Sequence, residues 1–279
     1  MGERRKSGDP GGLIQSGQSA IQSAICSLQS AFLDPVLSVL LAPACAVCGQ
    51  PLERPTLGPV CERCWRSILP LTPPLCDRCG DPLPAWRAIS VPLARCPRCR
   101  RGRRHVDRAR AIGGYDGSLR AIVHALKYEG RRSLARPLAA MMRARGADML
   151  AGADWVVPVP LHPSRRRERG FNQAADLAGY LDVPTLHALC RTRATATQTG
   201  LPAARRHRNV RGAFARTIGR EGREGLDGQE GLEGSVVVLV DDVSTTGATL
   251  EACARVLKEV AGVREVRALT AARVVMTAS

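Results

Sequence analysis

The sequence predicts an α/β protein whose sheet is mainly parallel, preceded by a small cysteine-rich region. Residues 236–240 form a continuous apolar run, which is typical of a strand buried on both faces. Residues 249–260 then take up the apolar period of a helix, and apolar segments alternate with helical periods from position 111 onward. Four Cys-x-x-Cys pairs lie upstream, between positions 45 and 99. The sequence therefore places a metal-binding module before an α/β domain.

The length and charge of the chain set limits on its class. With 279 residues, 44% of them hydrophobic, it suits one or two domains with a substantial core. Its formal net charge is +16, and only three of its 41 basic residues are lysine, which leaves 38 arginines. Arginine favours bidentate contacts with phosphate and carboxylate groups. The charge thus indicates an anionic partner without identifying one.

The cysteine spacing predicts two structural zinc sites. Adjacent pairs are separated by 12, 11 and 16 residues, as in zinc ribbons. In chain order, the two sites are Cys45, Cys48, Cys61 and Cys64, followed by Cys76, Cys79, Cys96 and Cys99. A cross-braced pairing of alternate pairs stays open, and a redox role explains four pairs in series less well. The use of cysteines as metal ligands indicates that the protein is in a reducing cytoplasm. The three cysteines outside the pairs, Cys26, Cys190 and Cys253, are expected to be packed thiols.

An internal repeat supports two similar ribbons in series. Residues 45–52 read Cys-Ala-Val-Cys-Gly-Gln-Pro-Leu, and residues 76–83 read Cys-Asp-Arg-Cys-Gly-Asp-Pro-Leu. In both copies a glycine, Gly49 or Gly80, follows the second cysteine, where a turn would direct backbone N–H groups at the thiolate sulfurs. Four thiolates complete a tetrahedral zinc, so neither site keeps an open position for catalysis.

Three regions are expected along the chain. Residues 1–44 comprise a disordered polar tail and an amphipathic helix, since residues 18–41 show helical apolar spacing. Asp34-Pro35 interrupts the apolar stretch, which is too short to cross a membrane, and no other span is expected. Residues 45–110 form the double zinc ribbon with a basic extension, and residues 111–279 form the α/β domain. Within it, the Gly- and Glu-rich residues 218–234 read as a disordered surface insertion.

The basic extension is a possible nucleic-acid contact. Residues 95–110 hold eight arginines against one acid, Asp107. Such a run is often a solvated face, but next to a zinc ribbon it can also follow a phosphate backbone. Aromatic residues make up only 3% of the chain, so base-stacking platforms are poorly supplied. We therefore expect this segment to bind single-stranded DNA with little specificity for base sequence.

The α/β domain is expected to contain a strand at 111–115, helices at 119–127 and 132–145, a strand at 155–161 and a helix at 172–181. Between positions 161 and 216 there are 11 arginines against three acids. A polyanionic ligand would fit between this basic region and the acids after residue 240. The arginines would bind it directly, and a Mg²⁺ would bridge it to the acids.

The stretch after the apolar run at 236–240 carries the clearest chemistry. Asp241 and Asp242 stand at the end of the strand, and a loop rich in Ser, Thr and Gly leads into the next helix. Ligands of open α/β sheets bind beyond the carboxyl ends of strands, and helix N-termini suit anions. A sugar phosphate fits such a site, because the paired acids can bind its diol and the loop can bind its phosphate. A Walker B strand would need a P-loop, which the chain lacks, whereas simple helix capping by the acids remains an alternative.

This stretch resembles the motif that binds 5-phosphoribosyl 1-pyrophosphate (PRPP) in type I phosphoribosyltransferases. The resemblance implies the type I phosphoribosyltransferase fold and PRPP bound with Mg²⁺. Asp241 and Asp242 would bind the ribose hydroxyls, directly or through Mg²⁺. The phosphate-binding stretch would comprise Val243, Ser244, Thr245, Thr246, Gly247, Ala248 and Thr249. In this stretch Gly247 suits a close approach of backbone to phosphate.

The same resemblance assigns further residues to the site. The turn of Pro158, Val159, Pro160 and Leu161 takes the place of the pyrophosphate loop. Residues 191–211 take the place of a flexible loop, whose Arg205, Arg206 and Arg208 would stabilise the leaving pyrophosphate. Lys127, the only lysine between positions 7 and 257, is assigned to the site as well. In oxopurine transferases the position of Thr245 is an acid that assists the purine, so such acceptors are disfavoured here.

Across nearly its whole length the chain resembles the ComF/GntX family. The shared features are the double zinc ribbon, Leu126-Lys127-Tyr128-Glu129-Gly130, Val157-Pro158-Val159-Pro160-Leu161, Arg169-Gly170-Phe171-Asn172-Gln173, the spaced set Gln198, Leu201, Arg205, Asn209 and Phe214, and Asp241 to Gly247. The resemblance implies a link to competence and the processing of transforming DNA, with competence or helicase-type protein partners. The insertion at 218–234 and the long N-terminal tail depart from the family pattern.

Three functional hypotheses remain open. The first is a Mg²⁺-dependent phosphoribosyltransferase with an unidentified acceptor. The second is a PRPP-responsive protein that handles nucleic acid without turnover. The third is a zinc-ribbon module that recruits partner proteins and carries a vestigial transferase domain.

Overall fold

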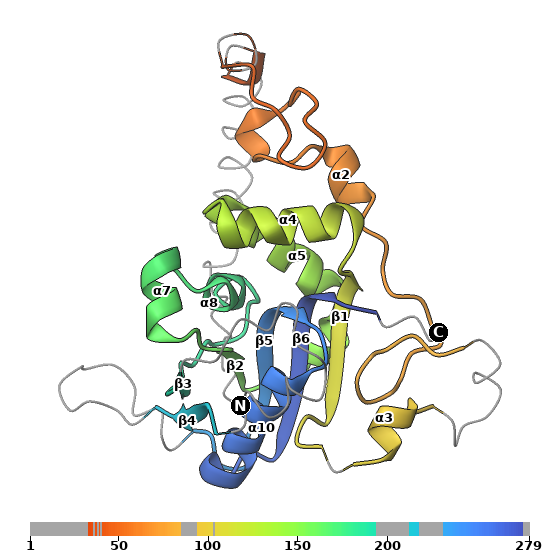
Figure 1. Cartoon of the computed structure of the whole chain (residues 1–279), viewed down its shortest axis with the longest axis vertical. Helices are drawn as coiled ribbons and strands as arrows, with labels where there is room; N and C mark the ends of the chain where they lie inside the picture. Colours follow the sequence, from red (N-terminus) through yellow and green to blue (C-terminus); the bar gives the residue numbers. More distant parts are fainter. Residues whose placement is uncertain are drawn as a thin grey trace, which may run out of the picture. The chain divides into compact units, whose positions relative to one another are not determined.

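The structure, a computed structural model, describes residues 33–84 apart from 36, 38 and 40, residues 94–193 apart from 103, and residues 212–217 and 231–275 (Figure 1). It divides into two compact units, Met1–Cys61 and Glu62–Ser279. The predicted disordered tail lies outside the described residues. The described residues between 33 and 41 are helical, in agreement with the helix predicted there. No helix in the described part of the chain is long and apolar enough to cross a membrane.

The smaller unit holds the first part of the ribbon region. A short 3-10 helix, η1 (Pro55–Leu57), follows an antiparallel bridge between Ala44 and Pro51. Asp34 is buried and accepts a hydrogen bond of 3.0 Å from the N–H of Thr56. This contact ties the preceding helical segment to the ribbon, because a buried carboxylate needs such a donor.

The larger unit contains a four-stranded parallel sheet in the order β1-β6-β5-β2 (Figure 1). Its strands are β1 (Arg108–Gly114), β2 (Trp155–Pro158), β5 (Val236–Ser244) and β6 (Glu265–Arg273). All three neighbouring pairs are parallel, so the four carboxyl ends lie at one edge of the sheet. That edge is where α/β proteins bind their ligands.

Helices cover both faces of this sheet. α5 (Ala135–Arg145), preceded by η4 (Arg132–Leu134), contacts β1 and β6, and α8 (Gln173–Ala178) contacts β2 and β5. α10 (Ala248–Ala261) packs on the face where Val237 and Leu239 meet Cys253 and Leu257. Side chains alternate along a strand, which explains why β5 is apolar at every position before its acids. The remaining helices are α2 (Glu62–Arg66), α3 (Pro97–Arg100), α4 (Gly117–Tyr128), α6 (Ala147–Leu150) and α7 (Pro163–Arg169).

The structure corrects several predicted boundaries. β1 begins at Arg108 and not at position 111, and β5 continues through the acid pair to Ser244. The sequence interpretation missed the central strand β6, the helix α7 and a small antiparallel sheet of β3 (Leu189–Arg191) and β4 (Phe214–Arg216). A three-residue strand is too short to show a period of two, and α7 buries no residue.

The insertion predicted at 218–234 is too long at its C-terminal end. Residues 218–230 lie outside the described part of the chain, but residues 231–234 form turns. Leu232 is 1% exposed, and the indole Nε1 of Trp155 donates to the carbonyl of Gly231 at 2.9 Å. This end is therefore packed, because the side chain of Leu232 belongs to the core under α10. At the other end, the N–H of Thr217 donates to the carbonyl of Ala188 at 2.9 Å.

Candidate functional site: two cysteine clusters and a cavity at the strand ends

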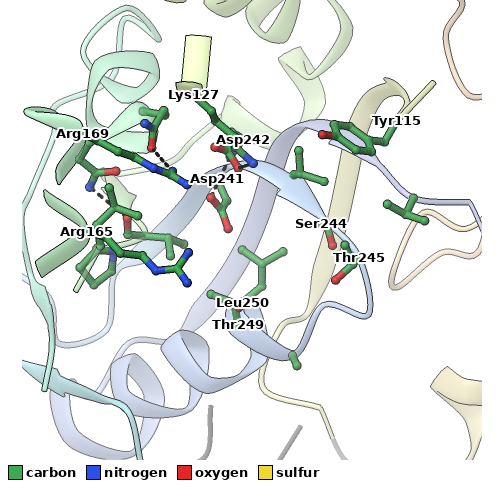
Figure 2. A pocket seen from close by; sticks show the side chains of 18 of the residues that line it. Tyr115, Lys127, Arg165, Arg169, Asp241, Asp242, Ser244, Thr245, Thr249 and Leu250 are labelled. Carbon is green, nitrogen blue, oxygen red and sulfur yellow. Dashed lines mark hydrogen bonds and ion pairs between the residues drawn. The ribbon is translucent and has the colours of Figure 1, made fainter. Parts of the chain in front are cut away.

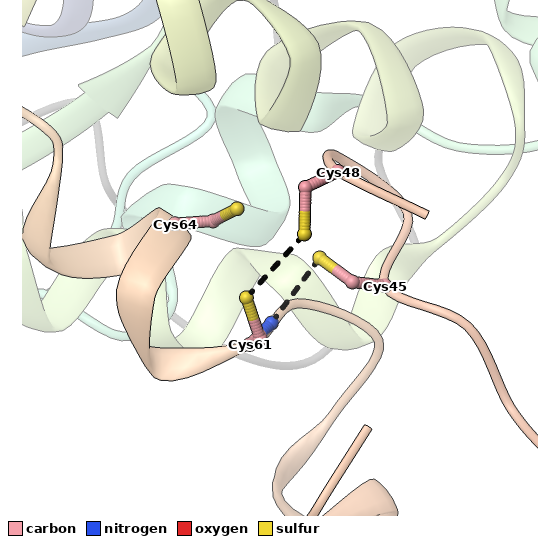
Figure 3. A group of neighbouring side chains, drawn as sticks. All are labelled: Cys45, Cys48, Cys61 and Cys64. Atoms are coloured by element: carbon pink, nitrogen blue, oxygen red, sulfur yellow. Dashed lines mark hydrogen bonds between the residues drawn. The ribbon is translucent and has the colours of Figure 1, made fainter. Parts of the chain in front are cut away.

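The eight paired cysteines form two groups of four in chain order, so the sequential assignment is confirmed. Within each group the Sγ atoms lie within 4.8 Å of one another, and in Figure 3 those of the first group point toward a common centre. The Sγ separations of 3.7 Å (Cys48 to Cys61) and 3.6 Å (Cys79 to Cys96) match the edge of about 3.8 Å expected for tetrahedral zinc with Zn–S bonds of about 2.3 Å. The residues therefore fit structural zinc.

The two ribbons repeat the same backbone turn. The N–H of Gly49 donates to the carbonyl of Cys45 at 2.9 Å, and the N–H of Gly80 donates to that of Cys76 at 2.9 Å. Both glycines have φ of 71°, a left-handed conformation that glycine adopts without strain. The N–H groups of Cys61 and Cys96 each donate to a cysteine sulfur, Cys45 and Cys76 respectively, at 3.3 Å. Although burial opposes it, backbone donors lower the pKa of Cys45 to about 6, which favours the thiolate that zinc needs.

The carboxyl ends of the four parallel strands open into one cavity of about 600 Å³. Tyr115 follows β1, Val159 follows β2, Asp241 to Ser244 end β5, and Val274 follows β6, and all of these line the cavity. In Figure 2, Arg165 and Arg169 enter from one side and Ser244 and Thr245 lie on the other, with the two aspartates between them. The topology thus brings basic, acidic and hydroxyl groups to one place.

The acid pair sits on β5 with its two side chains in different surroundings. Asp242 is 7% exposed and its Oδ1 lies 2.8 Å from the Nζ of Lys127 on α4 (Figure 2). Burial alone would lower the pKa of Lys127, but the charge of Asp242 holds it above its usual value. Burial and then the charge of Asp242 raise the pKa of Asp241 to about 8, against the opposing charge of Lys127. The burial of Asp241 and the neighbouring charge of Asp242 therefore both oppose ionisation of the Asp241 carboxyl group.

The loop between β5 and α10 exposes backbone to the cavity. Gly247 is left-handed (φ 75°) and precedes Ala248, the first residue of α10. Thr245, Gly247, Ala248 and Thr249 line the cavity. Thr246 does not, because its side chain turns back and its Oγ1 accepts a hydrogen bond of 3.4 Å from the N–H of Ala248. The role predicted for Thr246 in holding a phosphate stays a prediction.

The basic wall of the cavity comes mainly from α7 and the turn after it. Arg165 and Arg169 lie one turn apart on α7, which ends at left-handed Gly170 (φ 75°). The Nη1 of Arg169 donates to the Oε1 of Gln173 at 3.2 Å, and its guanidinium lies 5.0 Å from the ring centroid of Tyr128. Gln173 is 1% exposed, and its Nε2 has no hydrogen-bond partner among the described residues, which leaves a buried donor in the wall.

The outcome for the predicted site residues is mixed. Lys127, both aspartates, Val159 to Leu161 and the loop around Gly247 line the cavity, whereas Pro158 is buried within β2 and does not. Arg205, Arg206 and Arg208 lie outside the described residues. The residues missed by the sequence interpretation are Tyr115, Arg120, His124, Tyr128, Arg165, Arg169, Asn172, Gln173 and Arg191.

One signal could have found α7 and its arginines. Pro163 at the first helical position and Gly170 just past the end are the usual punctuation of a helix. The absence of an apolar face hid this helix from a search for periodicity.

Comparisons with protein families agree with this architecture. Residues 36–100 match a double zinc ribbon domain, and residues 168–274 match a phosphoribosyl transferase domain. The fold and the site thus define a protein that joins a double zinc ribbon to a phosphoribosyltransferase-type domain.

The similarity extends to whole proteins. Competence protein F of Haemophilus influenzae is 30% identical over 224 residues, covering 77% of this chain and 90% of that protein. The DNA utilization protein YhgH of Escherichia coli K12 is 34% identical over 224 residues, covering 76% and 89%. Competence protein ComFC of Bacillus subtilis is 26% identical over 204 residues, covering 72% and 78%. The chain belongs to the ComF family.

Proposed function

We propose that the cavity at the strand ends binds PRPP together with Mg²⁺. The observation that carries this proposal is the acid pair of β5 next to the left-handed glycine loop that opens α10, a helix of 14 residues. Asp241 and Asp242 supply acceptors for the two ribose hydroxyls. The N–H groups at the start of α10 point toward its N-terminal end, and together with the positive end of its dipole they suit the 5-phosphate.

The basic wall supports a place for the pyrophosphate. After β2, Val159 uses its backbone N–H and carbonyl within the fold, and Pro160 has no N–H, so Leu161 is the residue of this turn whose backbone N–H can face the ligand. Arg165, Arg169 and the Nε2 of Gln173, which has no partner among the described residues, offer further donors to the cavity. Mg²⁺ prefers oxygen ligands, and here it would be held by pyrophosphate oxygens and the carboxylates of Asp241 and Asp242. When bound, it would neutralise charge on the leaving pyrophosphate.

The chemistry we propose is displacement at C1 of the ribose. A nucleophile forms a bond to C1 while the bond from C1 to the pyrophosphate oxygen breaks, the bond electrons leave with the pyrophosphate, and the proton of the nucleophile passes to water. The arginines stabilise the negative charge that develops on the pyrophosphate. Among the described residues lining the cavity, Asp241 and Asp242 are the only carboxylates, and Thr245 stands where oxopurine transferases carry an acid. This supports an acceptor that needs no carboxylate base.

Calorimetric titration of PRPP with and without Mg²⁺ tests the donor site directly. We expect saturable binding of one PRPP per chain that weakens without Mg²⁺. Release of pyrophosphate across a panel of nucleobases, amines and single-stranded DNA then separates an enzyme from a ligand sensor or a zinc-ribbon recruiting module. Absence of PRPP binding in the zinc-loaded protein would contradict the proposal.

A second proposed function, in competence or DNA utilisation, is supported by the names of the relatives and by a groove on the larger unit. The groove is lined by four arginines and two acids: Arg78, Arg95, Arg108, Arg110, Asp77 and Asp107. Arg108 pairs with Asp148 at 2.7 Å, and Arg110 donates to backbone carbonyls, so part of the basic run supports the fold. Asp107 is neutralised by Lys258 at 2.6 Å. The excess positive charge suits a phosphate backbone.

Replacing Arg78, Arg95 and Arg108 together by serine is expected to weaken binding of a single-stranded oligonucleotide and to make it less sensitive to salt. For a single strand, each phosphate that the protein no longer neutralises lowers the slope of log K against log salt by about 0.7, so the slope should fall by roughly two. Fluorescence anisotropy between 50 and 200 mM salt, on the order of physiological ionic strength, measures this. The triple variant Arg136→Ser, Arg255→Ser and Arg264→Ser removes equal charge from residues that do not line the groove, and it serves as the control. Equal slopes for both variants would exclude the groove as the path.

A further inference from the structure

Each zinc ribbon begins with a tight turn at its first cysteine pair, here called a knuckle, and the two knuckles differ at a position that makes a long-range contact. Their shared motif is Cys-Gly-x-Pro-Leu, in which the variable residue is Gln50 in the first copy and Asp81 in the second. Both copies form the same turn, since the N–H of Cys45 donates to the carbonyl of Gln50 at 2.8 Å and that of Cys76 donates to the carbonyl of Asp81 at 2.7 Å. The knuckle backbone therefore accepts either side chain, and the carboxylate of Asp81 is not needed to form it.

The Asp81 carboxylate connects the second zinc site to the sheet. Its Oδ2 lies 3.4 Å from the Sγ of Cys79 and accepts a hydrogen bond of 2.9 Å from Arg98, whose Nη2 is also 4.0 Å from that sulfur. Its Oδ1 accepts a hydrogen bond from the Nε of Arg273, which is 3% exposed at the end of β6. One carboxylate thus joins the environment of a zinc-binding sulfur to a buried cation.

Arg273 in turn contacts β5, the strand that leads into the proposed phosphate-binding loop between β5 and α10 (the phosphate loop). It lies opposite Ser244 in the register of β5 and β6, and its Nη1 lies 3.5 Å from the Oγ of Ser244. Ser244 is 4% exposed and immediately precedes Thr245, the first residue of the loop. The N–H of Val274 also donates to the carbonyl of Ser244 at 2.9 Å. Any displacement of Arg273 therefore acts on the residue from which the loop begins.

A small cavity of about 30 Å³ adjoins the loop between β5 and α10 and shares Ser244, Gly247 and Leu250 with the cavity at the strand ends. Residues from the zinc site, Cys79 and Cys99, line it together with Thr246, Gly247 and Arg273. The Nη2 of Arg273 is buried and has no hydrogen-bond partner among the described residues. Among the described residues Asp81 is the one carboxylate that forms an ion pair with Arg273, and the Cys79 sulfur of the same ribbon adds to the negative charge around it.

We propose that the second zinc ribbon supports the phosphate loop through Asp81 and Arg273, so that PRPP affinity depends on this ribbon. This inference rests on the proposed PRPP site and concerns the regulation of that site. Asp81 and Arg273 are positioning residues, since neither lines the PRPP cavity. Without Asp81, the buried Arg273 guanidinium loses its carboxylate partner and leaves its position beside Ser244 to reach water. Loss of zinc from Cys76, Cys79, Cys96 and Cys99 has the same consequence, because it releases Asp81.

The variant Asp81→Gln tests the proposal and places in the second knuckle the residue that the first knuckle carries. We expect its PRPP dissociation constant to rise about tenfold, the lower end of effects seen for residues that position a site, while zinc stays at two per chain. Asp148→Asn is the control, since it breaks an exposed ion pair with Arg108 elsewhere on the unit. The double variant of Asp81→Gln with Arg273→Gln should weaken binding no further than Arg273→Gln alone, as expected for one shared contact.

Hydrogen exchange of the peptide that covers residues 244–250 gives a second measurement that needs no ligand. Faster exchange there in Asp81→Gln, but not in Asp148→Asn, supports the proposal even if the wild-type protein does not bind PRPP, which would contradict the proposed function alone. Unchanged exchange would overturn the proposal, as would a PRPP affinity within twofold of wild type. A zinc content of one per chain in Asp81→Gln would also overturn it, because the effect would then arise from metal loss and not from positioning.

Discussion

Replacing Cys96 by serine is expected to lower the zinc content from two ions per chain to one. Cys96 is 7% exposed, supplies a thiolate to the second group, and donates its backbone N–H to the sulfur of Cys76. A structural zinc site needs all four ligands, and metal binding contributes on the order of 10 kcal/mol to the folding of small zinc domains. The second ribbon should therefore lose its fold, which atomic emission and thermal unfolding would both detect.

The matched control for this prediction is Cys190→Ser. Cys190 lies outside both clusters, and its Sγ is 3.6 Å from the carbonyl of Ala215 in the small antiparallel sheet. This variant should retain both zinc ions. Two bound ions in Cys96→Ser would show that the cluster is not a four-cysteine zinc site.

Replacing Asp242 by asparagine is expected to weaken PRPP binding by roughly 10- to 100-fold, since a hydrogen bond to a charged group contributes about 1.5–3 kcal/mol. The change removes the carboxylate proposed to bind a ribose hydroxyl and leaves Lys127, whose side chain is 15% exposed, without its partner. Breaking a buried ion pair by removing one partner costs up to about 3–5 kcal/mol, and the partial exposure of this pair places the loss of unfolding free energy below that range. Calorimetry and thermal unfolding measure the two effects separately.

Asp182→Asn serves as the control, because it makes the same substitution at another aspartate that forms an ion pair. Asp182 pairs with Arg143, its side chain is 73% exposed, and its φ of 57° is one that asparagine tolerates. This variant should bind PRPP as the wild type does. If Asp242→Asn bound PRPP equally well, the ribose would not lie at the end of β5.

The sequence was sufficient to predict the features that depend on local pattern. The buried strand β5, its acids, the glycine loop and α10 are continuous in the chain, and the cysteine pairs have a characteristic spacing. Lys127 was assigned to the site because lysine is rare in this chain, and the structure supplies the physical reason, an ion pair with a carboxylate 115 positions away.

The remainder depends on side-chain direction and tertiary contact, which periodicity does not encode. Thr246 stands in the predicted phosphate-binding stretch, yet it lines the small cavity beside the second zinc ribbon and not the cavity at the strand ends. Arg165 and Arg169 belong to a helix without an apolar face, so apolar periodicity does not separate them from other surface arginines, and only Pro163 and Gly170 mark the ends of that helix. The contact between Asp81 and Arg273 joins positions 192 residues apart.

The chain is anchored by hydrogen bonds on both sides of residues 218–230, and these anchors bear on which substitutions the cavity tolerates. Before this stretch the N–H of Thr217 is held by Ala188, and after it Gly231 is held by the indole of Trp155, with Leu232 in the core. Neither anchor lies among the residues that line the cavity. Each anchor is held by contacts of its own, so a change confined to Thr217 or Gly231 is expected to leave the sheet edge at which the cavity lies intact.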